Sequence, residues 1–522
     1  MTIFFYIITI TLMILLPISL TIVLRRHAVV PWWLFVVGMG TFVGSQLYHI
    51  PLNNWLTDLG IIGPVVKTDP HFLQTAVLLG LSAGTCETLA RAIGYGFLFR
   101  RKAAAHWEDG IMVGLGHGGI EAMGLIAILT AASISSLWAM RGMDLSTLNL
   151  NQEQLDALTT QLAALDQTTW TALLPFVERI LAVTLHVVLS LLVWTAFQRR
   201  NPLYGIAALL YHSLFDFTAV YLAQFTQVGW LYATFLLLLL PGLAWAWLSR
   251  PRGAREKPVV LPIRTELALF GAALRKEMLQ QWRTKRVLVV LAVFVLFGLG
   301  SPLLAKYTPQ MLTMVEGAEQ FADLIPQPTQ ADALVQYIKN LTQFGFIIAV
   351  LLGMGAVAGE KDKGQAAMIL SKPLPRWAFL LSKFTAQALL YAAAFVIAGA
   401  GAYYYTLILF TPFQFGPFLL GNVLLLLWLL TYTAVTLLGS TIGKSIGQGA
   451  GIALVGAVIL LLAGSLPRIG SLAPAGLTAW ASQLGPETAV ATPANGGALV
   501  ASIVIIIVLL ISSIAIFETQ EL

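Results

Sequence analysis

The sequence predicts an all-α membrane protein built from two polytopic helical bundles, and three observations lead to this prediction. Of the 522 residues, 58% are hydrophobic and only 10% are charged, whereas about 25% of the residues of a soluble domain are charged. Apolar runs long enough to cross the ~30 Å hydrocarbon core of a bilayer recur along the chain. Lys and Arg are grouped in short segments between these runs, as membrane topology requires.

The apolar runs predict seven transmembrane helices before a polar linker and six after it. They lie near residues 4–24, 31–50, 72–98, 110–137, 174–197, 203–223, 228–248, 287–305, 341–359, 384–411, 417–438, 446–466 and 498–517. The first run has no basic segment before it, and Arg25 and Arg26 follow it. We therefore expect a retained first span with its N-terminus outside, and not a cleaved signal peptide.

The basic residues give the expected orientation and the domain boundary. Most of the 30 Lys and Arg residues fall in alternate loops, which we place in the cytosol together with the C-terminus of the chain. Residues 249–264 are rich in Pro, Gly and charge, so they predict a linker between membrane domains at 1–248 and 265–522. The net charge of +6 thus reflects a multi-pass protein of the cell (plasma) membrane in contact with lipid, with no nucleic-acid partner.

Ionisable residues inside the spans of the first half form the main candidate site. They occur as i,i+4 pairs, which share one helix face: Glu87 with Arg91, His117 with Glu121, His186 with Ser190, and His212 with Asp216. At 1.5 Å per residue from the cytosolic flank, one member of each pair lies roughly 18–20 Å deep. Such groups are costly in lipid, which makes them a functional-site hypothesis.

This set of side chains suits hydrolysis. Glu87 could act as general base on a water molecule, and Glu121 could share or relay the proton. His186 and His212 could orient the water or stabilise an oxyanion. Asp216 would fix a histidine tautomer. Arg91 would hold a carboxylate in place.

Other interpretations stay open for several members. His117 lies among glycines and could be a packed polar group at a close helix crossing, and Ser190 could serve helix packing alone. Arg179 is expected to face water or the external loop. No cofactor is predicted and no metal ligand is assigned. Zinc is compatible with two Glu and two His, but no His-Glu-x-x-His helix indicates it.

The same residues carry a resemblance to a known family. Four motifs occur in order: Glu87-Thr-Leu-Ala-Arg91, Gly116-His-Gly-Gly-Ile-Glu121, Glu178-Arg179 with His186-x-x-x-Ser190, and His212-Ser-Leu-Phe-Asp216. They resemble the YhfC family of glutamic-type intramembrane proteases, related to the CPBP (CAAX-protease and bacteriocin-immunity) and PrsW groups. The resemblance implies an intramembrane endopeptidase with catalytic Glu87, His186 and His212, and it places Glu121 where PrsW-like proteins have a Glu. Metal dependence is left open.

The second half contains a basic amphipathic stretch, 259–286, and one distinctive loop between two spans. This loop, the coupling loop, includes Glu360, Gly364, Ser371, Lys372, Pro373 and Arg376. It resembles the coupling region of ABC-2-type transporter permeases, which implies docking of a separate ABC ATPase subunit. The segment Gly439-Ser-Thr-Ile-Gly443-Lys-Ser is not a P-loop, because three residues separate its glycines where four are required.

Two functions from different classes follow from these observations. The first is a membrane protein that combines an intramembrane peptidase, acting on a membrane peptide or protein, with an ABC-2-type permease. The second is a transport permease whose first half is a non-catalytic, substrate-binding scaffold. A weaker third idea is a metal or proton pathway through the polar cluster. The sequence leaves open the substrate, the direction of transport and whether two copies pair as a homodimer.

Overall fold

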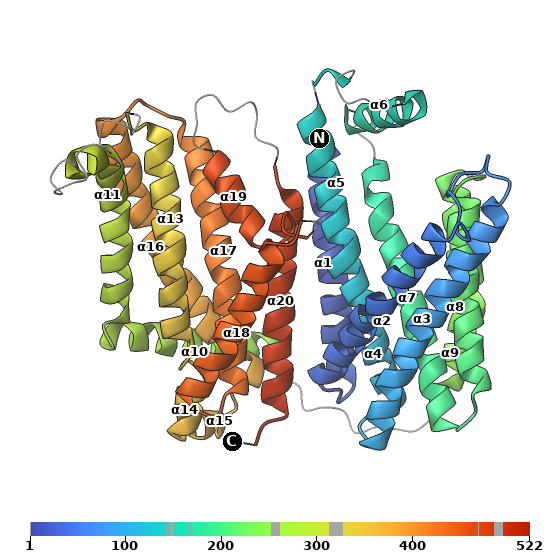
Figure 1. Cartoon of the computed structure of the whole chain (residues 1–522). Coiled ribbons are helices and arrows are strands. Elements are labelled where there is room, and N and C mark those ends of the chain that lie inside the picture. Colours follow the sequence, from blue (N-terminus) through green and yellow to red (C-terminus); the bar gives the residue numbers. More distant parts are fainter. Residues whose placement is uncertain are drawn as a thin grey trace. The chain divides into compact units, whose positions relative to one another are not determined.

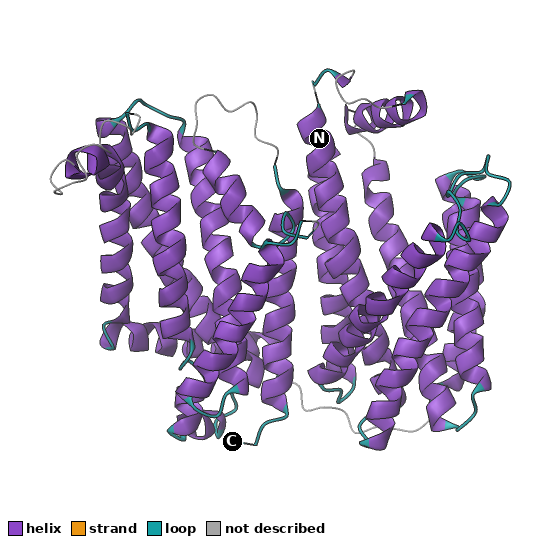
Figure 2. Cartoon of the chain, in the orientation of Figure 1, coloured by secondary structure: helices purple, strands orange, loops and turns teal. Residues whose placement is uncertain are grey.

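A computed structural model of the chain shows helices joined by loops, with no strand among the residues that it describes (Figure 2). The described residues are 2–141, 143–145, 151–166, 170–251, 261–312, 327–467, 469–484 and 494–521. Most of the predicted linker, residues 252–260, lies outside them. The fold divides into two compact units, Met1–Ala127 with Ala163–Val260 and Ile128–Leu162 with Leu261–Leu522.

The first unit holds the helices that carry the polar cluster (Figure 1). Its elements are α1 (Thr2–His27), α2 (Trp32–Asp58), α3 (Phe72–Arg100), α4 (Trp107–Glu121), the π-helical turn η1 (Ala122–Ile126), the 3-10 turn η3 (Trp170–Leu173), α7 (Leu174–Gln198), α8 (Leu203–Leu222) and α9 (Val228–Ser249). Proline stands at the start of some of these helices, where its missing N–H costs no helical hydrogen bond and its fixed φ suits the first turn. Pro31 precedes α2, and Pro202 precedes α8.

The second unit contains the remaining helices. They are α5 (Ala127–Met140, from Ile128), most of α6 (Gln152–Asp166), α10 (Ile263–Arg283), α11 (Arg286–Leu312), α13 (Gln330–Gly353), α14 (Ala358–Asp362), α15 (Gln365–Leu370), α16 (Arg376–Leu409), α17 (Phe415–Ile442), α18 (Ile446–Gly464), α19 (Ala475–Gln483) and α20 (Gly496–Glu518). Helices α11, α13, α16 and α17 enclose an aromatic and aliphatic core that includes Phe294, Tyr337, Tyr391 and Leu429.

Twelve helices of the described part are long and apolar enough to cross a membrane. They correspond to all the predicted spans except the second. That segment forms α2, a helix of 27 residues, but α2 is not among the twelve. Its C-terminal part carries the polar residues Gln46, His49, Asn53 and Asn54, which lower its mean hydropathy. The all-α membrane fold is confirmed, whereas a thirteenth apolar span is not.

Small residues bring α2 and α4 into backbone contact. A Cβ atom on Gly116 of α4 would lie 2.0 Å from the carbonyl oxygen of Phe35 on α2, and one on Gly38 would lie 2.1 Å from that of Val113. No real side chain tolerates such distances, so glycine is required at both positions. Close approach of this kind stabilises helix pairs in lipid, where no hydrophobic effect drives association. It also brings His117, the residue after Gly116, against α2.

Candidate functional site

The four helices α3, α4, α7 and α8 bring the predicted polar residues to one cavity. This cavity has a volume of about 110 Å³, enough for several water molecules. Its polar lining is Glu87, Glu121, Glu178, Arg179, His186, His212 and Asp216, and its apolar lining includes Leu185, Phe215 and Phe235. All four residues predicted to be catalytic therefore face the same space. Arg91, His117 and Ser190 are buried but do not line the cavity.

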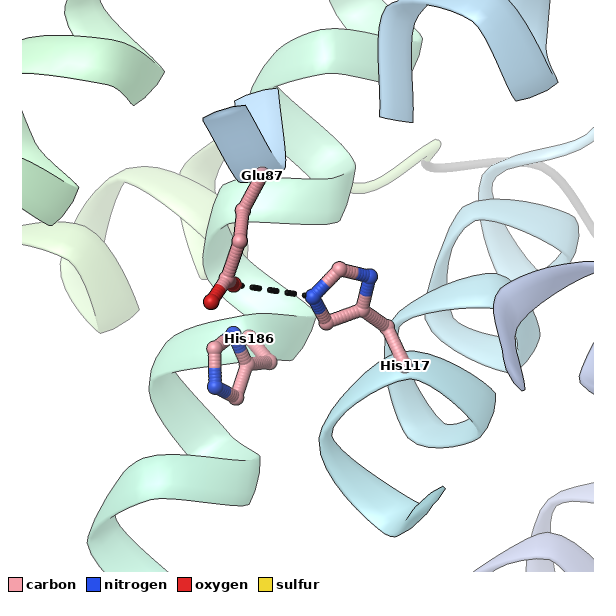
Figure 3. Close-up of side chains that lie close together, drawn as sticks. All are labelled: Glu87, His117 and His186. Atoms are coloured by element: carbon pink, nitrogen blue, oxygen red, sulfur yellow. Dashed lines mark hydrogen bonds and ion pairs between the residues drawn. The ribbon is translucent and has the colours of Figure 1, made fainter. Parts of the chain in front are cut away.

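Glu87 is the central carboxylate of the cluster. Its Oε2 lies 2.9 Å from His117 Nε2, 3.4 Å from Arg91 Nη2 and 3.7 Å from His212 Nε2. Figure 3 shows the contact with His117 and the position of His186 beside the same carboxylate. Three helices thus direct nitrogen atoms at one carboxylate oxygen, which itself belongs to a buried side chain.

The hydrogen bonds of His117 fix its tautomer. Thr41 on α2 donates its single hydroxyl hydrogen to Gly38 O at 2.7 Å. The same hydroxyl oxygen lies 2.8 Å from His117 Nδ1, so it must accept a hydrogen from Nδ1. His117 Nε2 then carries a lone pair when the ring is neutral, and this lone pair faces Glu87 Oε2. Two lone pairs facing each other repel, so the arrangement requires a proton or a cation between them.

His186 has the opposite tautomer. A guanidinium group can only donate, so Arg91 Nη2, at 2.6 Å, makes His186 Nδ1 the acceptor. The ring hydrogen is then on Nε2, which contacts Glu121 Oε2. Both nitrogen atoms of His186 are engaged by charged neighbours, and His186 links the carboxylate of α4 to the guanidinium of α3.

Glu121 is held from α7 as well. Arg179 Nη1 donates to Glu121 Oε1 at 2.7 Å, and Arg179 Nη2 donates to Glu178 Oε1 at 2.5 Å. The expectation that Arg179 faces water is wrong, since its side chain is buried between these carboxylates. The π-helical turn η1 begins at Ala122, directly after Glu121. Such turns are frequent at functional sites.

His212 and Asp216 form the outer edge of the cluster. Their side chains, one turn apart on α8, approach to 3.3 Å between His212 Nε2 and Asp216 Oδ2, as expected for an acid that orients an imidazole. The other ring nitrogen, His212 Nδ1, is buried and has no hydrogen-bond partner in the described residues. Asp216 is 35% exposed, so the cavity opens on this side.

Ser190 does not join the carboxylate cluster. Its hydroxyl lies 2.6 Å from the hydroxyl of Tyr95, and Tyr95 also donates to Gly110 O at 3.4 Å. The serine thus connects α7 with α3 and α4 one level away from Glu87. This contact agrees with the helix-packing alternative considered for Ser190.

The coupling loop of the second unit forms two short helices, α14 and α15, and its ends face inward. Glu360 is buried and pairs with Lys276 at 2.6 Å and with Lys383 at 2.8 Å. Arg376 Nη1 donates to the carbonyl oxygen atoms of Phe517, Glu518 and Gln520 at the end of α20. These two charges therefore anchor the loop within the unit.

The middle of the coupling loop is exposed. Gly364 has φ +67°, a left-handed conformation that favours glycine and that starts α15. Met368 on α15 is 65% exposed, and Ser371, Lys372 and Pro373 after it are exposed as well. Of the predicted docking surface, α15 and the Ser-Lys-Pro turn are therefore the parts that a partner can reach.

Comparisons with known proteins agree with this division of the chain. Residues 12–237 match the family model described as YhfC intramembrane metalloprotease, and residues 272–522 match that of the ABC-2 family transporter proteins. The chain joins a YhfC-family domain to an ABC-2-family permease domain. It is a multi-pass membrane protein, and the resemblances to the YhfC family and to ABC-2-type permeases are confirmed, although the YhfC model names a metalloprotease where the glutamic type was expected.

Two proteins of Bacillus subtilis (strain 168) are similar to parts of the chain. The uncharacterized transmembrane protein YxlG is 27% identical over 195 residues, which are 37% of this chain and 76% of YxlG. The uncharacterized membrane protein YhfC is 29% identical over 208 residues, which are 40% of this chain and 79% of YhfC.

The family description names a metalloprotease, and the side chains of the YhfC-family domain fit a metal ion in their donor chemistry. Ligand atoms of Glu87, His117 and His186 lie within 4.8 Å of one another. Two imidazoles and one carboxylate are a frequent ligand set of catalytic zinc. The hydrogen bond of His117 Nδ1 to Thr41 fixes the ring, as the hydrogen bond of the non-ligating nitrogen does for most metal-binding histidines. Zinc, which the sequence left open without indicating it, therefore has a candidate site.

The sequence alone did not point to Thr41 or Tyr95, and it predicted the wrong direction for Arg179. Each of the three contacts a predicted residue: Thr41 contacts His117, Tyr95 contacts Ser190, and Arg179 contacts Glu121. A signal existed for Thr41, because its depth is similar to that of His117: at 1.5 Å per residue, Thr41 lies roughly 14 Å from the start of α2 and His117 lies roughly 12 Å from Asp109. The direction of the Thr41 side chain, however, depends on the crossing of α2 and α4.

Proposed function

We propose that the YhfC-family domain is an intramembrane endopeptidase in which Glu87 activates the attacking water. The observation that supports this most is the cavity, where Glu87, Glu121, His186 and His212 surround a volume that holds several waters. Its apolar wall, with Leu185 and Phe215, suits a membrane peptide substrate. A buried carboxylate next to a water-sized space can act as a general base.

In the proposed reaction, a water in the cavity attacks the peptide carbonyl carbon while its proton passes to Glu87. A neutral His212 that carries its hydrogen on Nδ1 can donate it to the oxyanion, because Nδ1 has no hydrogen-bond partner among the described residues, while Nε2 lies 3.3 Å from Asp216 Oδ2. As the tetrahedral intermediate collapses, the C–N bond breaks and Glu87 returns the proton to the leaving amine. Arg91 Nη2, 3.4 Å from Oε2, keeps the carboxylate of Glu87 in position throughout.

A metal ion in this domain would be held by Glu87, His117 and His186. It would polarise the substrate carbonyl and make a bound water more acidic. With Glu87 serving as ligand, Glu121 is the cavity carboxylate that remains to accept the proton of the water. Arg179 would then keep Glu121 ionised and oriented through its 2.7 Å hydrogen bond.

The test is cleavage of quenched fluorescent transmembrane peptides by the full chain in lipid nanodiscs. Glu87→Gln is expected to lower kcat by about 10²–10⁴, the usual contribution of general base catalysis. Asp58→Asn, an exposed change at the end of α2, is the matched control and should keep the activity. Undiminished cleavage by Glu87→Gln would remove the base role of Glu87. Absence of cleavage by the unmodified chain against a broad peptide set would favour the non-catalytic scaffold.

We further propose that the ABC-2-family domain docks a separate ATPase through α15 on the cytosolic side. The exposed side chain of Met368, beside the exposed Lys372, supports this, because a short helix with an apolar knob and a cation can fit a groove of a soluble protein. Purified complex from native membranes should contain a P-loop ATPase, and Met368→Glu should reduce its co-purification. A complex that keeps its ATPase in this variant would contradict the assignment of α15.

A further inference from the structure

Arg91 occupies a place between two of the three side chains that could hold a metal ion. The arginine is completely buried on α3, one turn after Glu87. A single nitrogen, Nη2, lies 2.6 Å from His186 Nδ1 and 3.4 Å from Glu87 Oε2. The positive group of the side chain thus lies where a ligand from α3 and a ligand from α7 meet.

Arg91 opposes metal binding through both its hydrogen bond and its charge. The lone pair of His186 Nδ1 accepts the Arg91 hydrogen and cannot bind a metal at the same time. Arginine stays charged in proteins, so it cannot yield by losing a proton. In a medium of low dielectric, a divalent cation within a few ångströms of a guanidinium group is strongly repelled.

Arg91 is nevertheless weakly anchored. Its Nε and Nη1 atoms have no hydrogen-bond partner in the described residues, so the contacts of Nη2 are the ones that hold the guanidinium group in place. A long side chain held through one nitrogen can withdraw by rotamer changes that leave the helix intact. His117 needs no change of rotamer to offer its Nε2 atom to a metal ion, because the hydrogen bond of Nδ1 to Thr41 already fixes the ring.

We propose that Arg91 is a resident cation that competes with a divalent metal ion for Glu87 and His186. The site then has two states, one in which Arg91 bridges the carboxylate and the imidazole, and one in which a metal ion replaces it. Metal affinity is set by the exchange of these two cations, and metal loading requires Arg91 to withdraw. The inference concerns the proposed catalytic site, but it rests on ligand geometry and its test is a binding measurement.

Arg179 provides a matched comparison within the same cavity. It is also a buried arginine paired with carboxylates, but its partners are Glu121 and Glu178. It contacts neither Glu87 nor His186 in the described contacts. Removing either arginine makes the cavity more negative by one charge. Only removal of Arg91 frees Glu87 Oε2 and His186 Nδ1. Comparing the two variants therefore separates the effect of these contacts from the effect of the lost positive charge.

The experiment is a titration of the purified full chain with Co²⁺ in detergent, in which the visible absorption of coordinated Co²⁺ reports binding. In a second measurement, the Zn²⁺ content of the protein is determined by mass spectrometry after dialysis. Arg91→Met is expected to bind one equivalent at least tenfold more tightly than the unmodified chain. Arg179→Met should change the affinity less than threefold. Arg91→Met combined with His117→Ala should lose the spectral bands of the site.

Several outcomes would overturn the proposal. The first is that Arg91→Met and the unmodified chain bind Co²⁺ with equal affinity. The second is that Arg179→Met gains as much Co²⁺ affinity as Arg91→Met. The third is that the Co²⁺ absorption bands persist when His117→Ala is added to Arg91→Met. If Arg91→Met does not fold, Arg91→Lys replaces it, because the shorter reach of lysine should give an intermediate gain. An affinity of Arg91→Lys at or below that of the unmodified chain would then count against the proposal. Cleavage is not part of the readout, so failure of the peptidase proposal is recognised separately.

Discussion

A closed ring of four charges in the ABC-2-family domain allows a quantitative prediction. In ring order, Lys276 and Glu277 of α10, Lys383 of α16 and Glu360 of α14 alternate in sign. The successive ion-pair distances around the ring are 2.8, 2.8, 2.8 and 2.6 Å. The ring joins the amphipathic helix α10 to the coupling loop. The informative perturbation is Lys383→Met, which removes one positive charge and keeps the apolar stem.

The expected cost follows from burial. The Lys383 side chain is only 2% exposed, and its removal leaves Glu277 and Glu360 sharing one cation. Removing one partner of a buried ion pair costs about 3–5 kcal/mol. Lys276 faces the same carboxylates but is 41% exposed, so water can replace it and Lys276→Met should cost only about 0–1 kcal/mol. For a unit of this size, the first figure corresponds to a Tm lower by about 6–20 °C.

The assay is thermal unfolding in detergent, followed by tryptophan fluorescence, for the two single variants and for Lys383→Met with Glu360→Gln. The double variant should regain part of the lost stability, since no carboxylate is then left without its cation. If Lys276→Met lowers Tm as much as Lys383→Met, burial does not determine the strength of the ring. The reasoning from exposure would then be refuted.

Three further predictions concern single features. Thr41→Val should lower Co²⁺ affinity about 10–100-fold, because the tautomer of His117 is no longer fixed; an unchanged titration would contradict this role. Gly116→Ala should cost about 1–3 kcal/mol, since its methyl group meets the Phe35 carbonyl, and an unchanged Tm would show that the helices can separate. Burial lowers the pKa of Lys276, but its two glutamate partners outweigh this and raise the pKa above its usual 10.5. The stability that Lys276 contributes should therefore be fully present below pH 10.5 and be lost only as the pH rises above that value. The measurement is the difference in Tm between the unmodified chain and Lys276→Met as a function of pH. Loss of this difference near pH 8 would contradict the raised pKa.

The convergence of the polar cluster could be predicted because it depends on helix geometry alone. The i,i+4 spacing places Glu87 and Arg91, or His212 and Asp216, on one face, and the distance from charged flanks gives their depth. Both quantities are insensitive to rotamers. A resemblance to a family then indicated which of these faces meet. The cavity formed by Glu87, Glu121, His186 and His212 agrees with that prediction.

The individual partners could not be predicted, because they depend on side-chain directions within a depth layer. Glu121 was expected to share or relay the proton of Glu87, and the contacts pair Glu87 with His117 and Glu121 with His186. Arg179 could have pointed to the surface by rotation about its side-chain bonds. It turns inward because the Glu121 carboxylate would otherwise lack a cation in a buried position.

The two domains differ in how their buried charges are compensated. In the ring of the ABC-2-family domain, each charge has an opposite charge on both sides. In the YhfC-family domain, His212 Nδ1 and two nitrogen atoms of Arg91 remain without hydrogen-bond partners among the described residues. A fold that buries polar atoms without partners pays a cost that only a ligand, a water or a proton can recover. The unpartnered atoms of the polar cluster are the ones that the proposed catalytic role would use, whereas the closed ring holds α10 against the coupling loop.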